Sequence, residues 1–148
     1  MSIKNPMARA LELAEAAAAL GEVPVGAVIV RDGEIVAEAM NSMRSLGDPT
    51  AHAEMRAIRE ALDVLGADRL TDCDLYVTLE PCTMCAGAIA HARLRRVYYG
   101  APDPKGGAVD NGVRFFSAPT CHHRPEVIAG VSESAAAELL TRFFAARR

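Results

Sequence analysis

The chain has 148 residues, a length typical of one compact domain, and 51% of them are hydrophobic, which is enough apolar material for one core. Its longest run without a charged residue covers only residues 81–92, which is shorter than the roughly 18 residues a membrane span requires. The formal net charge of −3 argues against a protein whose whole surface coats nucleic acid. We therefore expect a single domain over residues 1–148 that does not cross a membrane.

Apolar spacing and turn residues predict the elements of the first half of the chain. In order these are a helix over residues 6–20, strands over 23–30 and 35–39, a loop over 41–49 and a helix over 51–65. Pro6 suits the first turn of the helix over residues 6–20, and Gly66 suits the end of the helix over residues 51–65. Asp32-Gly33 is the strongest hairpin signal in the chain, so the two strands should pair antiparallel.

The second half predicts alternating strands and helices. In order these are a strand over residues 74–79, a helix opened by Pro81, a strand over 96–100, an irregular connection over 102–112, a strand over 127–131 and a helix to 146 capped by Ser132. Alternating helices and strands after an opening hairpin predict a mixed sheet with helices on both faces.

The N-terminal segment is rich in Ala and Leu like a secretory leader, but Glu12 and Glu15 interrupt its apolar region. Of the four cysteines, only Cys82 and Cys85 are closely spaced, and a chain of this length can build its core without disulfides. We expect a cytoplasmic protein in which this Cys-x-x-Cys pair binds a metal or acts as a redox dithiol.

His52 and Glu54 fall at the start of one predicted helix, and Cys82 and Cys85 fall at the start of the next. The two cysteines are three positions apart, so their sulfurs share a helix face, where the helix N-terminus favours thiolates. Two thiolates and one imidazole supply three zinc ligands and leave the fourth tetrahedral position for water, which is the catalytic arrangement. Glu54 is near enough to carry protons as base and then acid. A closed structural zinc site or a redox dithiol is the alternative, but a dithiol would leave His52 and Glu54 without a role.

His-x-Glu followed by Pro-Cys-x-x-Cys is the pattern of the zinc nucleoside deaminases. Over nearly its whole length the chain closely resembles the bacterial tRNA adenosine deaminases. The segments that carry this resemblance are residues 22–28, 48–54, 75–88, 99–101, 103–107, 123–124 and 143–144.

The resemblance implies an α/β fold of the cytidine deaminase type, with three α/β/α layers, a central mixed sheet of about five strands, and helices on both faces. It also implies a homodimer that converts adenosine to inosine at the wobble position of the tRNA anticodon stem-loop. The family pattern assigns one Zn²⁺ per subunit to His52, Cys82 and Cys85, proton transfer to Glu54, and adenine contacts to Asn41 and Val25.

The last predicted helix carries the candidate RNA contacts Phe143, Phe144 and Arg147. One ring should pack the helix onto the domain while the other faces substrate, with Arg147 and Arg148 near phosphates. The alternative is that these residues do not contact RNA: the rings dock the helix onto the domain, and the arginines interact favourably with the C-terminal end of the helix dipole.

Charge is distributed unevenly along the chain. Through residue 80 there are 14 acidic and seven basic residues, whereas nine basic residues face five acidic ones from residue 81 onward. The excess of basic residues from residue 81 onward favours contact with a few phosphates. The alternative is that these are ordinary solvated surface charges. Ser42 and Arg142 depart from the family pattern, and we expect both near the RNA-facing rim.

Several other residues favour ordinary structural roles. We expect Glu80 to be an N-cap or a supporting group near the metal, Cys73 and four methionines (Met7, Met40, Met43 and Met55) to fill the core, and Cys121-His122-His123 not to form a second metal site. Without the resemblance, Asn41 would be interpreted as a strand end.

Two other functions remain open at this stage. The first is a deaminase of a free base or nucleotide, of the guanine or cytosine type, that uses the same metal centre. The second is a non-catalytic, zinc-stabilised RNA-binding module.

Overall fold

The computed structural model describes residues 5–147. Its strands are β1 (Gly26–Arg31), β2 (Glu34–Met40), β3 (Asp74–Leu79), β4 (Arg96–Ala101) and β5 (Glu126–Ile128). Its helices are α1 (Pro6–Ala19), α2 (Met43–Leu46), α3 (Ala53–Leu65), α4 (Thr83–Ala92) and α5 (Glu133–Ala145), with a 3₁₀ turn at Phe115–Ser117.

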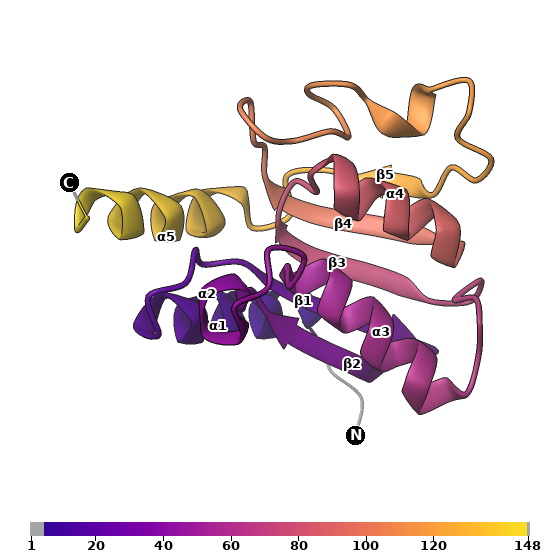
Figure 1. The fold of residues 1–148 in the computed structure, drawn as a ribbon, viewed down its shortest axis with the longest axis horizontal. Coiled ribbons are helices and arrows are strands. Elements are labelled where there is room, and N and C mark those ends of the chain that lie inside the picture. The colour runs from indigo at the N-terminus through magenta and orange to yellow at the C-terminus, as the bar shows by residue number, and fades with distance from the viewer. Residues whose placement is uncertain (1–4, 148) are drawn as a thin grey trace.

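The five strands form one mixed sheet in the order β2-β1-β3-β4-β5 (Figure 1). β1 runs antiparallel to both β2 and β3, whereas β3, β4 and β5 are parallel. The parallel pair β3 and β4 is joined by α4, as a parallel connection requires.

Helices cover both faces of the sheet. α3 and α4 pack on one face, where Ala57, Ile58 and Ile89 join the larger core. α1 packs on the other face, where Met7 and Ala10 contact residues of β1, and α5 lies beside α1 on that side. The expected three-layer α/β/α arrangement, with a central mixed sheet of five strands and helices on both faces, is therefore confirmed (Figure 1).

Some predicted boundaries are wrong. β1 begins at Gly26, because Pro24 has no N–H to donate to a sheet. α4 begins at Thr83, two residues after Pro81, and the predicted loop over residues 41–49 contains the short helix α2. Ser132 is the N-cap residue of α5 as predicted, but its backbone is left-handed and its side chain makes no capping hydrogen bond.

Strand pairing brings the functional segments to one end of the sheet. Because β1 is antiparallel to β3, the start of β1 lies beside the end of β3, and the Gly26 N–H donates to the Thr78 hydroxyl at 3.1 Å. A Cβ at Gly26 would lie 2.0 Å from the Ala10 carbonyl oxygen, so only glycine lets α1 approach β1 this closely. The segment after β2 and the starts of α3 and α4 reach the same end.

Over residues 5–147, the helices are too short or too polar to span a membrane. All four cysteines are free thiols, as predicted. Cys73 and Cys121 are buried in the larger core.

Candidate active site

Three predicted zinc ligands meet at the N-terminal ends of two helices. The Nδ1 atom of His52 lies 3.6 Å from the Cys82 sulfur and 3.5 Å from the Cys85 sulfur. His52 is the N-cap residue of α3 and Cys82 that of α4, and both have an extended backbone. The three donor atoms all lie within 4.8 Å of one another.

This geometry fits a tetrahedral zinc ion. Zinc–sulfur and zinc–nitrogen bonds of about 2.3 and 2.0 Å at a tetrahedral angle separate sulfur from nitrogen by roughly 3.5 Å. The two nitrogen–sulfur distances match this value. His52, Cys82 and Cys85 can therefore hold one Zn²⁺ with little rearrangement.

The environment of Cys82 favours its thiolate form. A hydrogen bond from the Cys85 thiol, together with the N–H groups at the start of α4, lowers the pKa of Cys82 to about 5. The pKa of Cys85 is raised, because its thiol donates that bond and is itself buried. A cation at this site would favour the thiolate of both.

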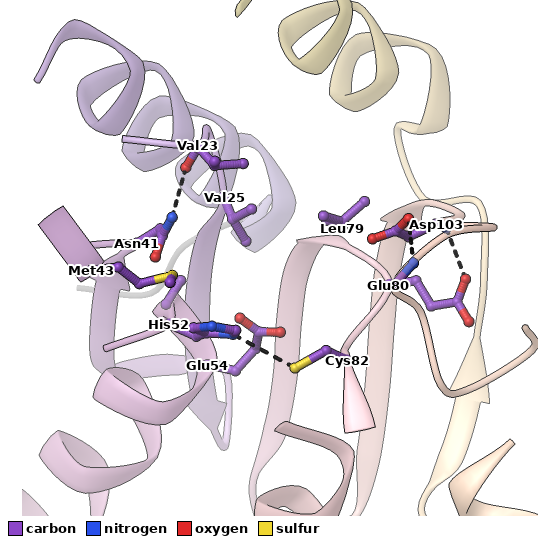
Figure 2. A pocket seen from close by; sticks show the side chains of 12 residues that line it. Val23, Val25, Asn41, Met43, His52, Glu54, Leu79, Glu80, Cys82 and Asp103 are labelled. Atoms are coloured by element: carbon purple, nitrogen blue, oxygen red, sulfur yellow. Dashed lines mark hydrogen bonds between the residues drawn. The ribbon is translucent and has the colours of Figure 1, made fainter. Parts of the chain in front are cut away.

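Glu54 lies next to the three ligands with its carboxylate between His52 and Cys82 (Figure 2). It is 4% exposed, and this burial raises its pKa to about 7. A carboxyl group whose pKa lies near neutrality can both accept and release a proton at physiological pH. Glu54 therefore has the position and the acidity of a proton carrier.

A cavity of about 310 Å³ opens beside these residues (Figure 2). Both predicted adenine contacts line it: Val25 from the segment before β1, and Asn41 from the segment after β2. The Nδ2 of Asn41 donates to the Val23 carbonyl at 3.3 Å, whereas its buried Oδ1 has no hydrogen-bond partner. An unpaired buried acceptor costs free energy, and a donor on a molecule bound in the cavity can remove that cost.

Sequence reasoning missed part of the cavity wall. Met43 was expected in the core but lines the cavity, as do Leu79, Asp103 and Gly106. Residues 103–107 carry part of the family resemblance, but no role in the site was predicted for Asp103 or Gly106, because both lie in the irregular segment after β4 and reach the cavity only through tertiary packing.

Glu80 borders the cavity but is not an N-cap, because α4 is preceded by Cys82 in that position. Burial would raise its pKa, yet hydrogen bonds from the Asp103 N–H and from the side chain and N–H of Asn111 outweigh that effect. The pKa of Glu80 is therefore below its ordinary value, and its carboxylate supports the segment after β4.

The two phenylalanines of α5 differ in burial, and the predicted substrate contact of Phe144 stays a prediction. Phe143 is buried beneath the Arg147 guanidinium, which lies 3.6 Å from its ring centre, whereas Phe144 is 46% exposed. Phe144 and Arg147 line a second cavity of about 670 Å³, which shares Asp103 and Gly106 with the first. Arg148 lies outside the described residues.

The two departures from the family pattern differ in exposure. Ser42 is buried, and its hydroxyl donates to the Met40 carbonyl and accepts from Arg56, so this side chain does not face a rim. Arg142 is exposed, but it borders a cavity between α1 and α5 and not either of the two described above.

Among residues 5–147, His52, Cys82 and Cys85 form the only group that could hold a metal ion. The Cys121 thiol donates to the His123 carbonyl, and the His123 ring contacts the Leu94 carbonyl at 2.7 Å. Within residues 5–147, the side chains of residues 121–123 therefore do not bring three metal-ligating atoms together.

The family model for the cytidine and deoxycytidylate deaminase zinc-binding region matches residues 1–101, which include His52, Glu54, Cys82 and Cys85. The chain belongs to this deaminase family. A tRNA-specific adenosine deaminase of Agrobacterium fabrum is 58% identical over 96% of this chain and 93% of its own length. The predicted resemblance to the bacterial tRNA adenosine deaminases is confirmed.

Two solved deaminases have the same fold. A tRNA:A34 deaminase, which carries out A-to-I editing at the wobble position of transfer RNA, is 59% identical, with a TM-score of 0.90 over 91% of this chain and 98% of its own. The guanine deaminase of Bacillus subtilis is 37% identical, with a TM-score of 0.66 over 99% of this chain and 94% of its own.

Proposed function

We propose that the chain is a zinc-dependent adenosine deaminase that converts adenosine to inosine at the wobble position of a tRNA anticodon loop. The observation that carries this proposal is the cavity in which Glu54 and the unpaired Asn41 oxygen lie beside the His52–Cys82–Cys85 cluster. The A34 deaminase, at 59% identity, supports the choice of substrate.

His52, Cys82 and Cys85 would hold the zinc ion through one nitrogen and two sulfurs. When bound there, zinc acts as a Lewis acid that makes water nucleophilic at neutral pH. Among residues 5–147 there is one such cluster, so we expect one Zn²⁺ per subunit, which elemental analysis of the purified protein will measure.

Glu54 carries the protons of the reaction. Hydrolysis replaces the amino group on C6 of adenine with oxygen from water and releases ammonia. Glu54 takes a proton from the attacking water, gives it to a ring nitrogen, and delivers the second proton to the departing amine. Its burial keeps solvent from exchanging these protons.

Asn41 and Val25 hold the base. The Asn41 Oδ1 accepts a hydrogen bond from the bound base, and adenine offers its exocyclic amine as a donor. Val25 supplies an apolar wall for the purine ring. An anticodon base is already single-stranded, so moving it into the cavity costs less than flipping a base out of a duplex.

The second cavity supports a polymeric substrate. It shares Val23, Leu79, Asp103 and Gly106 with the first cavity and adds Phe144 and Arg147. An exposed ring and a guanidinium suit a neighbouring base and a phosphate. A free base would have no use for this space.

A free-base deaminase remains the second candidate, because the Bacillus subtilis guanine deaminase shares the fold at 37% identity. Ammonia release from an anticodon stem-loop, free adenosine, guanine and cytosine will distinguish the two. We expect turnover on the stem-loop, and activity confined to the small molecules would overturn the tRNA assignment.

We further propose that residues 1–148 form one catalytic domain that acts as a homodimer in the cytoplasm. One sheet with a core on each face supports the single domain. Four free thiols suit a reducing compartment, and the dimer follows from the family resemblance. Sedimentation of the purified protein tests the dimer, with a monomer at all concentrations as the contrary result.

A further inference from the structure

The segment of residues 102–112, which we call the pocket loop, has no regular secondary structure. It supplies Asp103 and Gly106 to the wall shared by the two cavities. A loop without ladder hydrogen bonds needs other acceptors for its buried N–H groups. The Glu80 carboxylate provides them.

Glu80 is 2% exposed, and both of its oxygens accept hydrogen bonds from the pocket loop. Oε1 accepts from the Asp103 N–H at 2.9 Å and from the Asn111 side-chain amide at 2.6 Å. Oε2 accepts from the N–H groups of Val109, Asp110 and Asn111 at 3.1, 2.9 and 3.0 Å. One carboxylate therefore joins the two ends of the loop.

The loop wraps closely around this carboxylate. A Cβ added at Gly107 would lie 2.5 Å from the Glu80 Cδ atom and 2.7 Å from its Oε1. Only glycine lets the backbone pass at this distance. The loop conformation and the Glu80 side chain are thus mutually dependent.

Glu80 itself is turned away from the reacting groups. Figure 2 shows its side chain directed away from Glu54 and toward the backbone near Asp103. Because five N–H donors already use its acceptor positions, it has no free capacity to carry protons.

We propose that Glu80 is a positioning residue: its carboxylate holds the pocket loop so that Asp103 and Gly106 form the wall between the two cavities, and in this way it sets the affinity for RNA. This inference rests on the proposed function. It assigns Glu80 an effect on substrate binding and not on the chemical step.

The substitution Glu80→Gln tests this directly, because it preserves shape but not acceptor capacity. Whichever way the amide is turned, its NH₂ group faces at least two of the five N–H donors. We expect KM for the anticodon stem-loop to rise about tenfold or more while kcat changes by less than about threefold. Zinc content should stay at the wild-type level.

Hydrogen exchange tests, independently of activity, whether the pocket loop has loosened. In E80Q, exchange should accelerate at the amides of Asp103, Val109, Asp110 and Asn111 and remain unchanged in the sheet. The control is Glu126→Gln, which removes an exposed carboxylate that pairs with Arg96. Arg96 starts β4, so this pair lies at the end of the strand that is remote from the cavity. E126Q should leave KM and loop exchange unchanged.

Tyr99→Phe is a second variant in case E80Q does not fold. The Tyr99 hydroxyl donates to the Asp110 carboxylate, so this change loosens the same loop without altering Glu80. KM should rise by a smaller factor than in E80Q, with faster exchange confined to the loop. A loosened loop with unchanged KM would overturn the proposal.

Two other results would also overturn it: a loss of kcat at constant KM in E80Q, and unchanged loop exchange in that variant. If the wild-type enzyme does not act on the stem-loop, the proposed function fails separately. The role of Glu80 is then judged by loop exchange and by KM for whichever small base the enzyme does accept.

Discussion

Cap geometry accounts for the arrangement of the metal ligands at the scale of single residues. Cys82 is the N-cap residue of α4, and Cys85 is its third helical residue. N-cap and third-position side chains face each other, as they do in a capping box. His52 occupies the equivalent cap position of α3. Two helix starts that face each other therefore place one nitrogen and two sulfurs within one coordination sphere.

Glu54→Gln is expected to abolish turnover while preserving the metal site. An amide of the same shape cannot carry protons, so kcat should fall by about 10² to 10⁴-fold. Zinc content and RNA affinity should be nearly unchanged, because Glu54 is not one of the three donor residues. Ammonia release, elemental analysis and a binding titration measure the three quantities. Wild-type ammonia release from the variant would refute the role of Glu54.

Asn41→Ala is expected to lower kcat/KM while leaving the free energy of unfolding nearly unchanged. The unpaired buried Oδ1 costs free energy in the unliganded protein, and its removal offsets the loss of the Nδ2 bond to Val23. The free energy of unfolding should change by less than about 1 kcal/mol, whereas kcat/KM should fall about ten- to a hundredfold. Denaturant titration and steady-state kinetics provide the measurements. Unaltered kcat/KM would show that Asn41 does not contact the base.

At the scale of elements, α2 depends on a carboxylate from another segment. A helix of four residues cannot persist alone. The buried Glu22 carboxylate accepts from the N–H groups of Arg44 and Ser45 and from the Ser45 hydroxyl, at 3.0, 2.6 and 2.6 Å. These bonds hold α2 against the segment that contains Glu22, and Met43 at the start of α2 lies in the cavity wall.

Glu22→Gln should remove an acid-sensitive part of the stability. Burial would raise the pKa of Glu22, but the hydrogen bonds from Ser45 and Arg44 outweigh it and hold the pKa below 4.5. A lowered folded-state pKa stabilises the protein above pH 4.5, and that contribution is lost as pH falls through the folded value. Urea unfolding of both proteins across this acidic range should show a shallower pH dependence in E22Q. At neutral pH the variant should be about 1–3 kcal/mol less stable. Parallel pH curves for the two proteins would contradict this account.

At the scale of the whole molecule, basic residues concentrate in the second half of the chain although the net charge is −3. Lys105 and Arg147 from this half line the second cavity. An acidic body with local basic groups can bind a few phosphates without coating nucleic acid along its surface.

RNA affinity should therefore fall as salt rises. The logarithm of the binding constant for the anticodon stem-loop should decline linearly with the logarithm of salt concentration, with a slope near −0.7 for each phosphate contact. Arg147→Ala should make the slope shallower by about one contact. Titrations at several salt concentrations measure both slopes. A flat dependence in the wild-type protein would exclude phosphate contacts.

Local patterns in the sequence determined the fold class and the chemical groups of the site. Helical spacing, the Asp32-Gly33 turn and the alternation of elements predicted the mixed sheet with helices on both faces. His52, Glu54, Cys82 and Cys85 could be identified because their chemistry depends on short spacings at helix starts. Such signals are visible because they act between residues only a few positions apart.

Only the tertiary structure decided the shape of the pocket. The cavity wall contains Met43, Asp103 and Gly106, which come together through strand pairing and through a loop held by Glu80. These residues are too far apart in the sequence for helix or strand periodicity to predict that they meet. The unpaired oxygen of Asn41 and the inward position of Ser42 depend equally on neighbours distant in the chain. Long-range packing and hydrogen bonding place these groups, so the spacing of residues along the sequence does not predict their positions.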